Sequence, residues 1–373
     1  MRTLFTILVA SLLVLSAVPA VLAVSTSVST GLDIDVEEFA PLVDLCGSRI
    51  VTDDNVEPWR VSDGGQYLVE RINNYAFEGE KISWLVLVMD KNKIDQNIDV
   101  YATIGDSQGE GNEIEANCLR ADYQSSVAKQ NFDSCNAEIL EEELEFNPDT
   151  MAFFECTLTV ETPASMYGEY WVTVEAQDGS GLMGTMDENE FWFFNPVIAL
   201  SIDGELSFDN VRPGSSSYSD TLLIGNDADA GSGVLLDMFI SGTDFYDSSS
   251  SGARCPDTNQ LALTNFRYFI TSGAYSSFDD PRSASDPEGE SYVAINYGNS
   301  FGNVGTNNPF YGTHEILQAG GPFVVGGPFG SAGYKANILV PGAEHALTFR
   351  LDLPEPCNGD FDTGSIYFWG EAI

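Results

Sequence analysis

Residues 154–161 read FECTLTVE, and along this stretch every second side chain is apolar. The apolar positions are Phe154, Cys156, Leu158 and Val160, and the polar positions between and after them are Glu155, Thr157, Thr159 and Glu161. Successive side chains of a β-strand point to opposite faces of a sheet, so this pattern predicts a strand with one buried face and one face in water.

The same alternation recurs further along the chain. One apolar face is formed by Tyr170, Val172, Val174 and Ala176, and another by Leu347, Phe349, Leu351 and Leu353, whose neighbours Thr348, Arg350 and Asp352 we expect to face water. Residues 82–89 (ISWLVLVM) are apolar on both faces, which is typical of a central strand that is covered on both sides. Short strands separated by turn residues are the pattern of β-sandwiches. The sequence therefore predicts an all-β protein built from Ig-like or jelly-roll β-sandwich domains.

The first 23 residues have the composition of a signal peptide. Arg2 precedes an uncharged apolar stretch over residues 4–22, and Val21-Leu22-Ala23 fits signal-peptidase cleavage after Ala23. The stretch is also just long enough to be an uncleaved membrane span, but Pro19 and the residues before the cut favour cleavage. No second apolar run of membrane length follows. We expect a mature chain without a membrane span that is secreted or held at the cell surface.

The remaining 373 − 23 = 350 residues are enough for two domains of ordinary size. Asn195-Pro196 is a natural boundary, because proline biases the residue before it toward extended geometry and interrupts strands. We therefore expect two tandem domains after the signal peptide of residues 1–23. The first would cover residues 24–195 and the second residues 196–373.

Parts of the chain resemble known exported sandwich proteins. Residues 168–174 (GEYWVTV) resemble the penultimate strand of immunoglobulin-like domains, and residues 77–80 with the following strand resemble the second strand of bacterial-type Ig-like repeats. In the second half, Val340-Pro341-Gly342 and the strand-like end at 366–369 are similar to TasA/camelysin-like sandwiches of extracellular fibres. The whole layout resembles exported, archaeal-type cell-surface proteins. These resemblances imply a β-sandwich protein at the cell surface.

All six cysteines follow the predicted signal peptide: Cys46, Cys118, Cys135, Cys156, Cys255 and Cys357. An even number of cysteines in an exported chain indicates disulfides, and none lies in a CxxC motif or near a histidine as a zinc site would require. Four lie in the first half and two in the second, which predicts two bonds in the first half and a Cys255–Cys357 bond in the second. The first four cysteines allow three connectivities, and the sequence does not choose among them.

The chain carries 57 acidic and 15 basic residues, a formal net charge of −42. Such a surface repels nucleic acids and anionic lipids, so neither is expected as a partner. With 43% hydrophobic and 12% aromatic residues, the chain is too apolar to be a disordered acidic tail. The acidic surface serves either solubility, for instance in salty surroundings, or the binding of divalent cations, and we favour solubility.

Three acidic loops contain the oxygen ligands that Ca²⁺ prefers. Their acidic residues are Asp106, Glu110 and Glu113 in the first loop, Asp227 and Asp229 in the second, and Asp360 and Asp362 in the third. None matches the full EF-hand pattern, and each also fits an ordinary polar turn. Ca²⁺ is thus the one cofactor that the sequence leaves open.

Residues 298–333 form a long glycine-rich loop with interspersed aromatic residues. Phe310, Tyr311, Phe323 and Phe329 are its candidate binding residues, because aromatic rings on a loop can contact a partner or a sugar ring. The other interpretation is a flexible excursion that merely decorates the sandwich. The sequence supports both interpretations equally.

No pattern indicates a catalytic centre. The two histidines, His314 and His345, lie outside any HExxH motif, and we expect both at the surface. Neither a strand–GxSxG–helix nucleophile elbow, nor a P-loop, nor a GxGxxG between a strand and a helix is predicted. Paired carboxylates could hydrolyse glycosides, but among 57 acids such pairs arise by chance. We do not expect an enzyme.

Together these features predict a non-catalytic extracellular or cell-surface structural or adhesion protein, such as an envelope or appendage component. Its partners would be other surface proteins or further copies of itself, with assembly by strand addition at the final strand. The alternative is a glycan- or partner-binding surface module that uses the glycine-rich loop. A secreted hydrolase ranks third.

Overall fold

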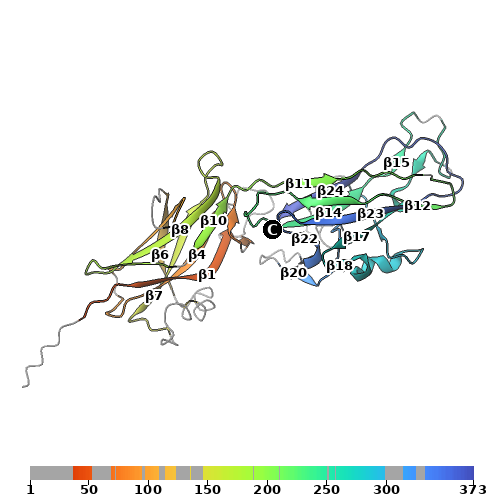
Figure 1. Cartoon of the computed structure of the whole chain (residues 1–373). Helices are drawn as coiled ribbons and strands as arrows, with labels where there is room; N and C mark the ends of the chain where they lie inside the picture. Colours follow the sequence, from red (N-terminus) through yellow and green to blue (C-terminus); the bar gives the residue numbers. More distant parts are fainter. Residues whose placement is uncertain are drawn as a thin grey trace, which may run out of the picture. The chain divides into compact units, whose positions relative to one another are not determined.

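The computed structural model describes residues 37–52, 69–71, 73–94, 97–108, 114–122, 135, 146–187, 189–209, 211–249, 252–256, 258–298, 314–324 and 332–373. Residues 39–373 belong to one compact unit, and residues 1–38 form a separate unit of which only the last two are described. The predicted signal peptide therefore lies outside the described residues. The larger unit is built from strands (Figure 1), which confirms the expected all-β class.

Ten strands between residues 42 and 194 make one sheet. They are β1 (Leu42–Thr52), β2 (Val69–Arg71), β3 (Tyr75–Ala76), β4 (Lys81–Met89), β5 (Asp99–Gly105), β6 (Ile114–Ala121), β7 (Met151–Thr159), β8 (Gly168–Gln177), β9 (Met183–Thr185) and β10 (Glu190–Phe194). Their order is β2-β1-β4-β7-β6-β5-β8-β10-β3, and β9 pairs with β8. All of these pairings are antiparallel except that of β10 with β3.

This sheet folds over on itself as a sandwich, because side chains from its two halves meet in one core. The residues that meet include Ile82, Trp84 and Val86 of β4, Phe154 and Cys156 of β7, Ile104 of β5, Val172 and Val174 of β8, and Trp192 and Phe194 of β10. The sheet turns at β6, which pairs with β7 on one side and with β5 on the other.

Strand β4 confirms what its sequence predicts. All residues from Ile82 to Met89 are buried. One face of β4 joins the core described above, and the other joins a second apolar cluster that contains Leu87, Phe153 and the cysteines Cys46 and Cys135. The strand is thus covered on both sides, as its continuous run of apolar residues predicts.

Residues 200–372 form two further sheets. The larger has the order β11-β13-β23-β17-β18, with β12 beside β23 and β19 beside β17, and the smaller has the order β22-β14-β24. The bounds are β11 (Leu200–Asp203), β12 (Ser216–Tyr218), β13 (Leu222–Asn226), β14 (Leu236–Gly242), β17 (Phe266–Ser272), β18 (Tyr275–Ser276), β19 (Val293–Ala294), β22 (Ile338–Leu339), β23 (Glu344–Asp352) and β24 (Ile366–Ala372).

Short elements connect these strands. Two two-stranded ribbons pair β15 (Phe245–Tyr246) with β16 (Gln260–Leu261) and β20 (Pro322–Val324) with β21 (Ala332–Tyr334). The 3-10 helices are η2 (Leu263–Asn265), η3 (Ser277–Asp279), η4 (Pro281–Ser285) and η5 (Lys335–Asn337). No described residue belongs to a helix that is long and apolar enough to cross a membrane.

A common core lies between the two later sheets. Alternate residues of β14 (Leu236, Met238 and Ile240) and of β23 (Leu347, Phe349 and Leu351) contribute to it. The apolar face predicted for the last long strand is therefore confirmed. Arg350 on the opposite face is a correction, because its side chain is fully buried instead of facing water.

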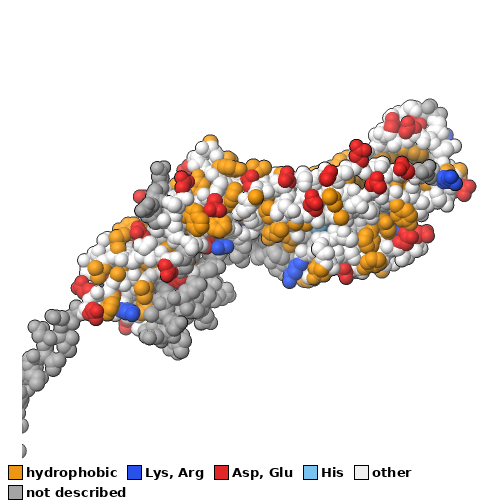
Figure 2. Space-filling model, in the orientation of Figure 1, with side chains coloured by type: hydrophobic (Ala, Val, Ile, Leu, Met, Phe, Trp, Pro, Cys, Tyr) orange, Lys and Arg blue, Asp and Glu red, His pale blue; other side chains and the backbone are white. Residues whose placement is uncertain are grey.

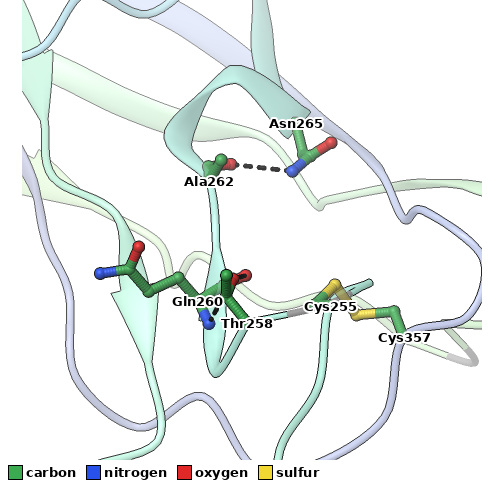
Figure 3. The surroundings of a disulfide bond; sticks show 6 residues. All are labelled: Cys255, Thr258, Gln260, Ala262, Asn265 and Cys357. Atoms are coloured by element: carbon green, nitrogen blue, oxygen red, sulfur yellow. Dashed lines mark hydrogen bonds between the residues drawn. A yellow bond between two sulfur atoms is a disulfide. The ribbon is translucent and has the colours of Figure 1, made fainter.

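The three disulfides join all six cysteines. Cys255 bonds to Cys357, the pair expected from the sequence. The connectivity that the sequence leaves open is Cys46–Cys135 and Cys118–Cys156. The latter pair lies directly opposite on β6 and β7. Figure 3 shows the Cys255–Cys357 bond beside the turn in which the Asn265 side chain donates to the Ala262 carbonyl.

Among the described strands, none that precedes Asn195 pairs with one that follows it. The domain boundary at Asn195-Pro196 and the number of domains stay predictions.

Candidate functional site

Arg350 lies at the centre of a buried ionic cluster. Its Nη2 donates to Asp286 Oδ1 at 2.5 Å and its Nη1 donates to Asp286 Oδ2 at 3.1 Å, a bidentate pair. The same guanidinium donates to Asp352 through Nε at 3.0 Å and to Glu290 through Nη1 at 3.1 Å. Three carboxylates thus surround one guanidinium, which explains how a charged residue can be fully buried on β23.

Asp286 is held in its ionised form by this cluster. Burial alone would raise the pKa of Asp286, but the hydrogen bonds from Arg350 and from the backbone N–H groups of Tyr292 and Glu288 lower it to about 2. The turn after η4 is closed by the same carboxylate, because Oδ2 accepts the N–H groups of Glu290 and Tyr292, each at 3.0 Å. One aspartate therefore both neutralises Arg350 and shapes the segment that leads into β19.

A second buried acidic group consists of Asp237 on β14 and Glu315, which lies between β19 and β20. Asp237 is 2% exposed and Glu315 is 0% exposed. A Cβ at Gly333 would lie 3.2 Å from Asp237 Oδ2 and 3.4 Å from Glu315 Oε1, so both carboxyls face the same backbone. Burial and the nearby charge of Glu315 raise the pKa of Asp237 to about 8, although Asn337 donates to Asp237 Oδ1 at 2.6 Å. The raised pKa favours the neutral form of Asp237, which lowers the cost of burying the pair.

The described residues contain one group of three His, Cys, Asp or Glu side chains close enough to share an ion. It consists of Asp44, Cys46 and Cys135. The two sulfurs are joined in a disulfide. They therefore cannot act as the thiolate ligands that a metal requires.

The described acidic residues proposed for Ca²⁺ lie in segments between strands. Asp229 Oδ2 accepts the Val197 N–H and the Tyr167 hydroxyl, each at 2.9 Å. Asp362 accepts the N–H and the hydroxyl of Ser248, and these bonds lower its pKa. The other described candidates, Asp106, Asp227 and Asp360, are exposed, and Glu110 and Glu113 lie outside the described residues. Calcium binding stays a prediction.

The aromatic candidates of the glycine-rich loop are mostly beyond the described part of the chain. Phe310, Tyr311 and Phe329 lie outside it. Phe323 belongs to β20, but its side chain is not described. A binding role of this loop also stays a prediction.

The expectation that both histidines lie at the surface is wrong. His345 is 0% exposed, with Nε2 at 3.3 Å from the Asn337 carbonyl oxygen, and burial lowers its pKa to about 4. His314 is 7% exposed, with Nε2 at 3.2 Å from the Tyr297 carbonyl oxygen. The position of His345 could have been read from the sequence, because it continues the buried face of Leu347 and Phe349.

Two GxSxG sequences occur, at residues 105–109 and 298–302. The serine of the first, Ser107, is exposed and lies between β5 and β6, which are antiparallel neighbours. It is therefore not on a strand-to-helix elbow, the setting that activates a GxSxG serine. The serine of the second lies outside the described residues.

Within the described part of the chain, one edge of β24 has no partner strand. Among the described strands, β24 pairs only with β14. The hydrogen bonds Thr243 N–H to Ser365 O and Ile373 N–H to Leu235 O set the register of this pair. In an antiparallel pair, hydrogen-bonded and non-bonded positions alternate. The residues whose N–H and C=O groups point away from β14 are therefore Ile366, Phe368, Gly370 and Ala372.

The side chain of Leu200, on β11, lies near the middle of β24. A Cβ at Gly370 would be 3.5 Å from Leu200 Cδ1 of β11. Strand β11 has only β13 as a described partner, so it also ends a sheet. Apolar side chains in and around β11 are exposed: Val197 (52%), Ile198 (46%), Ile202 (52%) and Leu206 (37%). Strand β24 (IYFWGEA) has no lysine or proline, the residues that commonly protect sheet edges.

No protein-family model and no curated protein matches the sequence. Solved structures give distant matches. The C-terminal domain of the Streptococcus agalactiae AgI/II polypeptide BspA shares 9% identity at a TM-score of 0.26, over 89% of this chain and 97% of that one. The C-terminal domain of the Streptococcus pyogenes antigen I/II-family protein AspA shares 8% identity at a TM-score of 0.24, over 90% of this chain and 97% of that one.

A third match is a structure titled as the chaperone–tip adhesin complex of CFA/I fimbriae biogenesis. It shares 8% identity at a TM-score of 0.22, over 88% of this chain and 85% of that one. TM-scores this low assign neither a fold nor a function to the chain. The resemblance to TasA/camelysin-like and archaeal-type surface proteins gains no support from these matches and stays a prediction.

Proposed function

We propose that this chain is a non-catalytic extracellular or cell-surface structural protein, an envelope or appendage component that assembles through its open strand edge. The observation that carries the proposal is the edge of β24, which turns the backbone groups of four residues away from β14 and has no partner strand there among the described strands. An unprotected edge of this length is a template for pairing with another strand.

The three disulfides support a place outside the cytoplasm, since disulfides persist in oxidising compartments. The signal peptide predicted for residues 1–23 would supply export. An Ig-like β-sandwich domain over residues 24–195 and a second β-sandwich domain over residues 196–373 would supply the body of the protein. The resemblance of the second half to fibre-forming sandwiches is in line with assembly.

Self-assembly has to overcome charge repulsion between copies. Cleavage after Ala23 removes one basic residue and no acid, so the mature chain carries 14 − 57 = −43 formal charges. Salt screens such repulsion, because the Debye length falls from about 8 Å at 0.15 M to about 3 Å at 1 M. Assembly through main-chain hydrogen bonds should therefore strengthen as the salt concentration rises. An acidic surface is suited to such salty surroundings.

Substituting Gly370 tests the edge directly. Gly370→Pro removes an outward N–H from the middle of β24 and places a ring on the edge, while the N–H groups that bond β14 remain. We expect this variant to lose all multimers in 1 M salt. Sedimentation velocity of the purified mature chain is the measurement.

The matched control is Gly370→Ala. It adds the same Cβ against Leu200 and Leu236 but keeps the N–H, so it should assemble like the unchanged protein. If both variants form multimers equally well, the β24 edge is not the assembly site.

The cellular location is tested separately. The chain purified from its native cells should begin at Val24, lie in the envelope or medium fraction, and contain no titratable thiol. N-terminal sequencing, fractionation and a thiol assay under denaturing conditions measure these three properties. Recovery from the cytoplasm with six free thiols would contradict the proposed surface role.

A further inference from the structure

Four aromatic rings form a row on the outer face of the larger late sheet. The row, which we call the aromatic row, consists of Tyr218, Tyr292, Phe269 and Phe278 in that order. Neighbouring ring centroids are 5.9 Å, 5.7 Å and 5.2 Å apart. The rings come from β12, from the segment before β19, from β17 and from η3, so the fold gathers them from four separate places.

The alternation along β17 explains which face the row occupies. Phe266, Tyr268 and Ile270 point into the core. Phe269 lies between two of them in the sequence and therefore points to the opposite face. Phe278 is 73% exposed and Tyr218 is 48% exposed, so both ends of the row are open to solvent.

Ionised groups surround the row. The buried Arg350 guanidinium lies 4.8 Å from the centre of the Tyr292 ring. Tyr218 donates its hydroxyl to Glu290 at 2.7 Å, and Arg267 donates to the Tyr292 carbonyl at 3.4 Å. The Glu290 and Asp352 side chains remain 46% and 27% exposed, respectively.

The local charge is negative. Two basic residues, Arg267 and Arg350, stand against four acidic residues, Asp279, Asp286, Glu290 and Asp352, which gives 2 − 4 = −2. The whole chain has the same sign at −42. On the face seen in Figure 2, hydrophobic and acidic side chains are interspersed and basic ones are few.

We propose that the aromatic row is a docking surface for a basic segment of a partner protein. Arginine or lysine side chains of the partner would stack on the exposed faces of Phe278 and Tyr218, where a cation is attracted to the ring. The exposed carboxylates of Glu290 and Asp352 would pair with the same cations. The negative field of the chain would steer such a partner toward the surface.

Charge complementarity is what favours a basic polypeptide over a sugar. A neutral glycan would gain nothing from the surplus of carboxylates, and an acidic glycan would be repelled by it. Neighbouring rings of the row also meet at 52–73°, so they do not form the continuous flat platform on which successive sugar rings would lie. Docking of a basic segment at the aromatic row is independent of how the chain assembles.

The test measures binding of a labelled peptide of alternating arginine and glycine to the full mature chain, by fluorescence anisotropy at physiological ionic strength. The variant is Phe278→Ala with Tyr218→Ala, and the control is Tyr101→Ala, which removes a 45% exposed ring from β5. All substitutions are neutral, so the general attraction of a polycation to the acidic chain is the same in each protein.

We expect the double variant to bind the peptide about four- to twenty-five-fold more weakly, since each of the two exposed cation–π contacts is worth a factor of about two to five. The Tyr101→Ala control should stay within about twofold of the unchanged protein on the same basis. Phe278→Ala alone should give about a two- to fivefold loss, and it decides the matter if the double variant fails to fold.

The proposal would be overturned if the single variant, the double variant and the control all bound the peptide as tightly as the unchanged protein. It would also be overturned if a neutral linear glucan bound the chain and only that binding disappeared in the double variant, because the row would then be a sugar site. These outcomes are independent of cellular location and of assembly at β24, so failure here is distinguishable from failure of the proposed function.

Discussion

Replacing Arg350 with methionine should lower the free energy of unfolding by about 3–5 kcal/mol, the usual cost of removing one partner from a buried ion pair. Methionine fills a similar length but leaves Asp286 buried with no cation to offset its charge. Asp286 and Arg350 are both fully buried in their side chains and joined by two hydrogen bonds. Chemical denaturation followed by circular dichroism is the measurement.

A double substitution separates the charge effect from lost packing. Arg350→Met combined with Asp286→Asn removes both buried charges. This double variant should regain a large part of the unfolding free energy that the single variant loses, since the charge of Asp286 is no longer left uncompensated. If the double variant is as unstable as the single one, packing around the guanidinium is what matters and the ionic account is wrong.

The same pair predicts a pH dependence. The folded-state pKa of Asp286 is lowered from 3.8 to about 2. A group whose folded pKa is depressed contributes stability above its unfolded pKa, and that contribution is lost as the pH falls through the folded value. The unchanged protein should therefore lose this contribution between about pH 4 and pH 2. Asp286→Asn should flatten that part of the stability curve.

Removing the Cys255–Cys357 bond is the second change with a large expected effect. The two cysteines are 102 residues apart, and cross-linking a loop of about 100 residues restricts the unfolded chain by about 4.7 kcal/mol in the entropy model. We expect Cys255→Ala with Cys357→Ala to lower the melting temperature by about 10 °C. Differential scanning calorimetry of the oxidised proteins is the measurement.

Cys118→Ala with Cys156→Ala is the comparison. That bond spans 38 residues and joins directly opposed strands. The entropy term grows only with the logarithm of loop length. Removing the Cys118–Cys156 bond should therefore destabilise the protein less than removing the Cys255–Cys357 bond, by a difference of less than about 1 kcal/mol. A melting temperature that does not change when Cys255 and Cys357 are replaced would show that the bond adds nothing to stability.

Much of the fold could be predicted from the period of the apolar residues. Residues 82–89 are buried on both faces, and Leu347, Phe349 and Leu351 lie in one core, as the alternation indicates. The disulfide of the second half followed from counting cysteines in each half. The connectivity of the first four could not follow, because it depends on β6 lying beside β7, a pairing between distant parts of the chain.

The same alternation predicts exposure wrongly where a polar residue has a partner far away in the sequence. Arg350 reads as a water-facing residue, but Asp286, 64 residues earlier, allows it to be buried. The aromatic row was missed for the same reason, since its four rings come from four elements and share no sequence motif. The sequence drew attention instead to the aromatic residues of the glycine-rich loop, which lie largely outside the described residues.

The Cys255–Cys357 bond also bears on what happens when a protease reaches the protein. A cut anywhere in the glycine-rich loop falls between the two cysteines, so both pieces stay covalently attached. Strand β17 lies before such a cut and β23 after it, and their backbone ladder runs from Phe266 to Thr271. A nicked molecule would thus travel as one particle through an oxidising exterior and come apart only where a reductant and an unfolding agent act together.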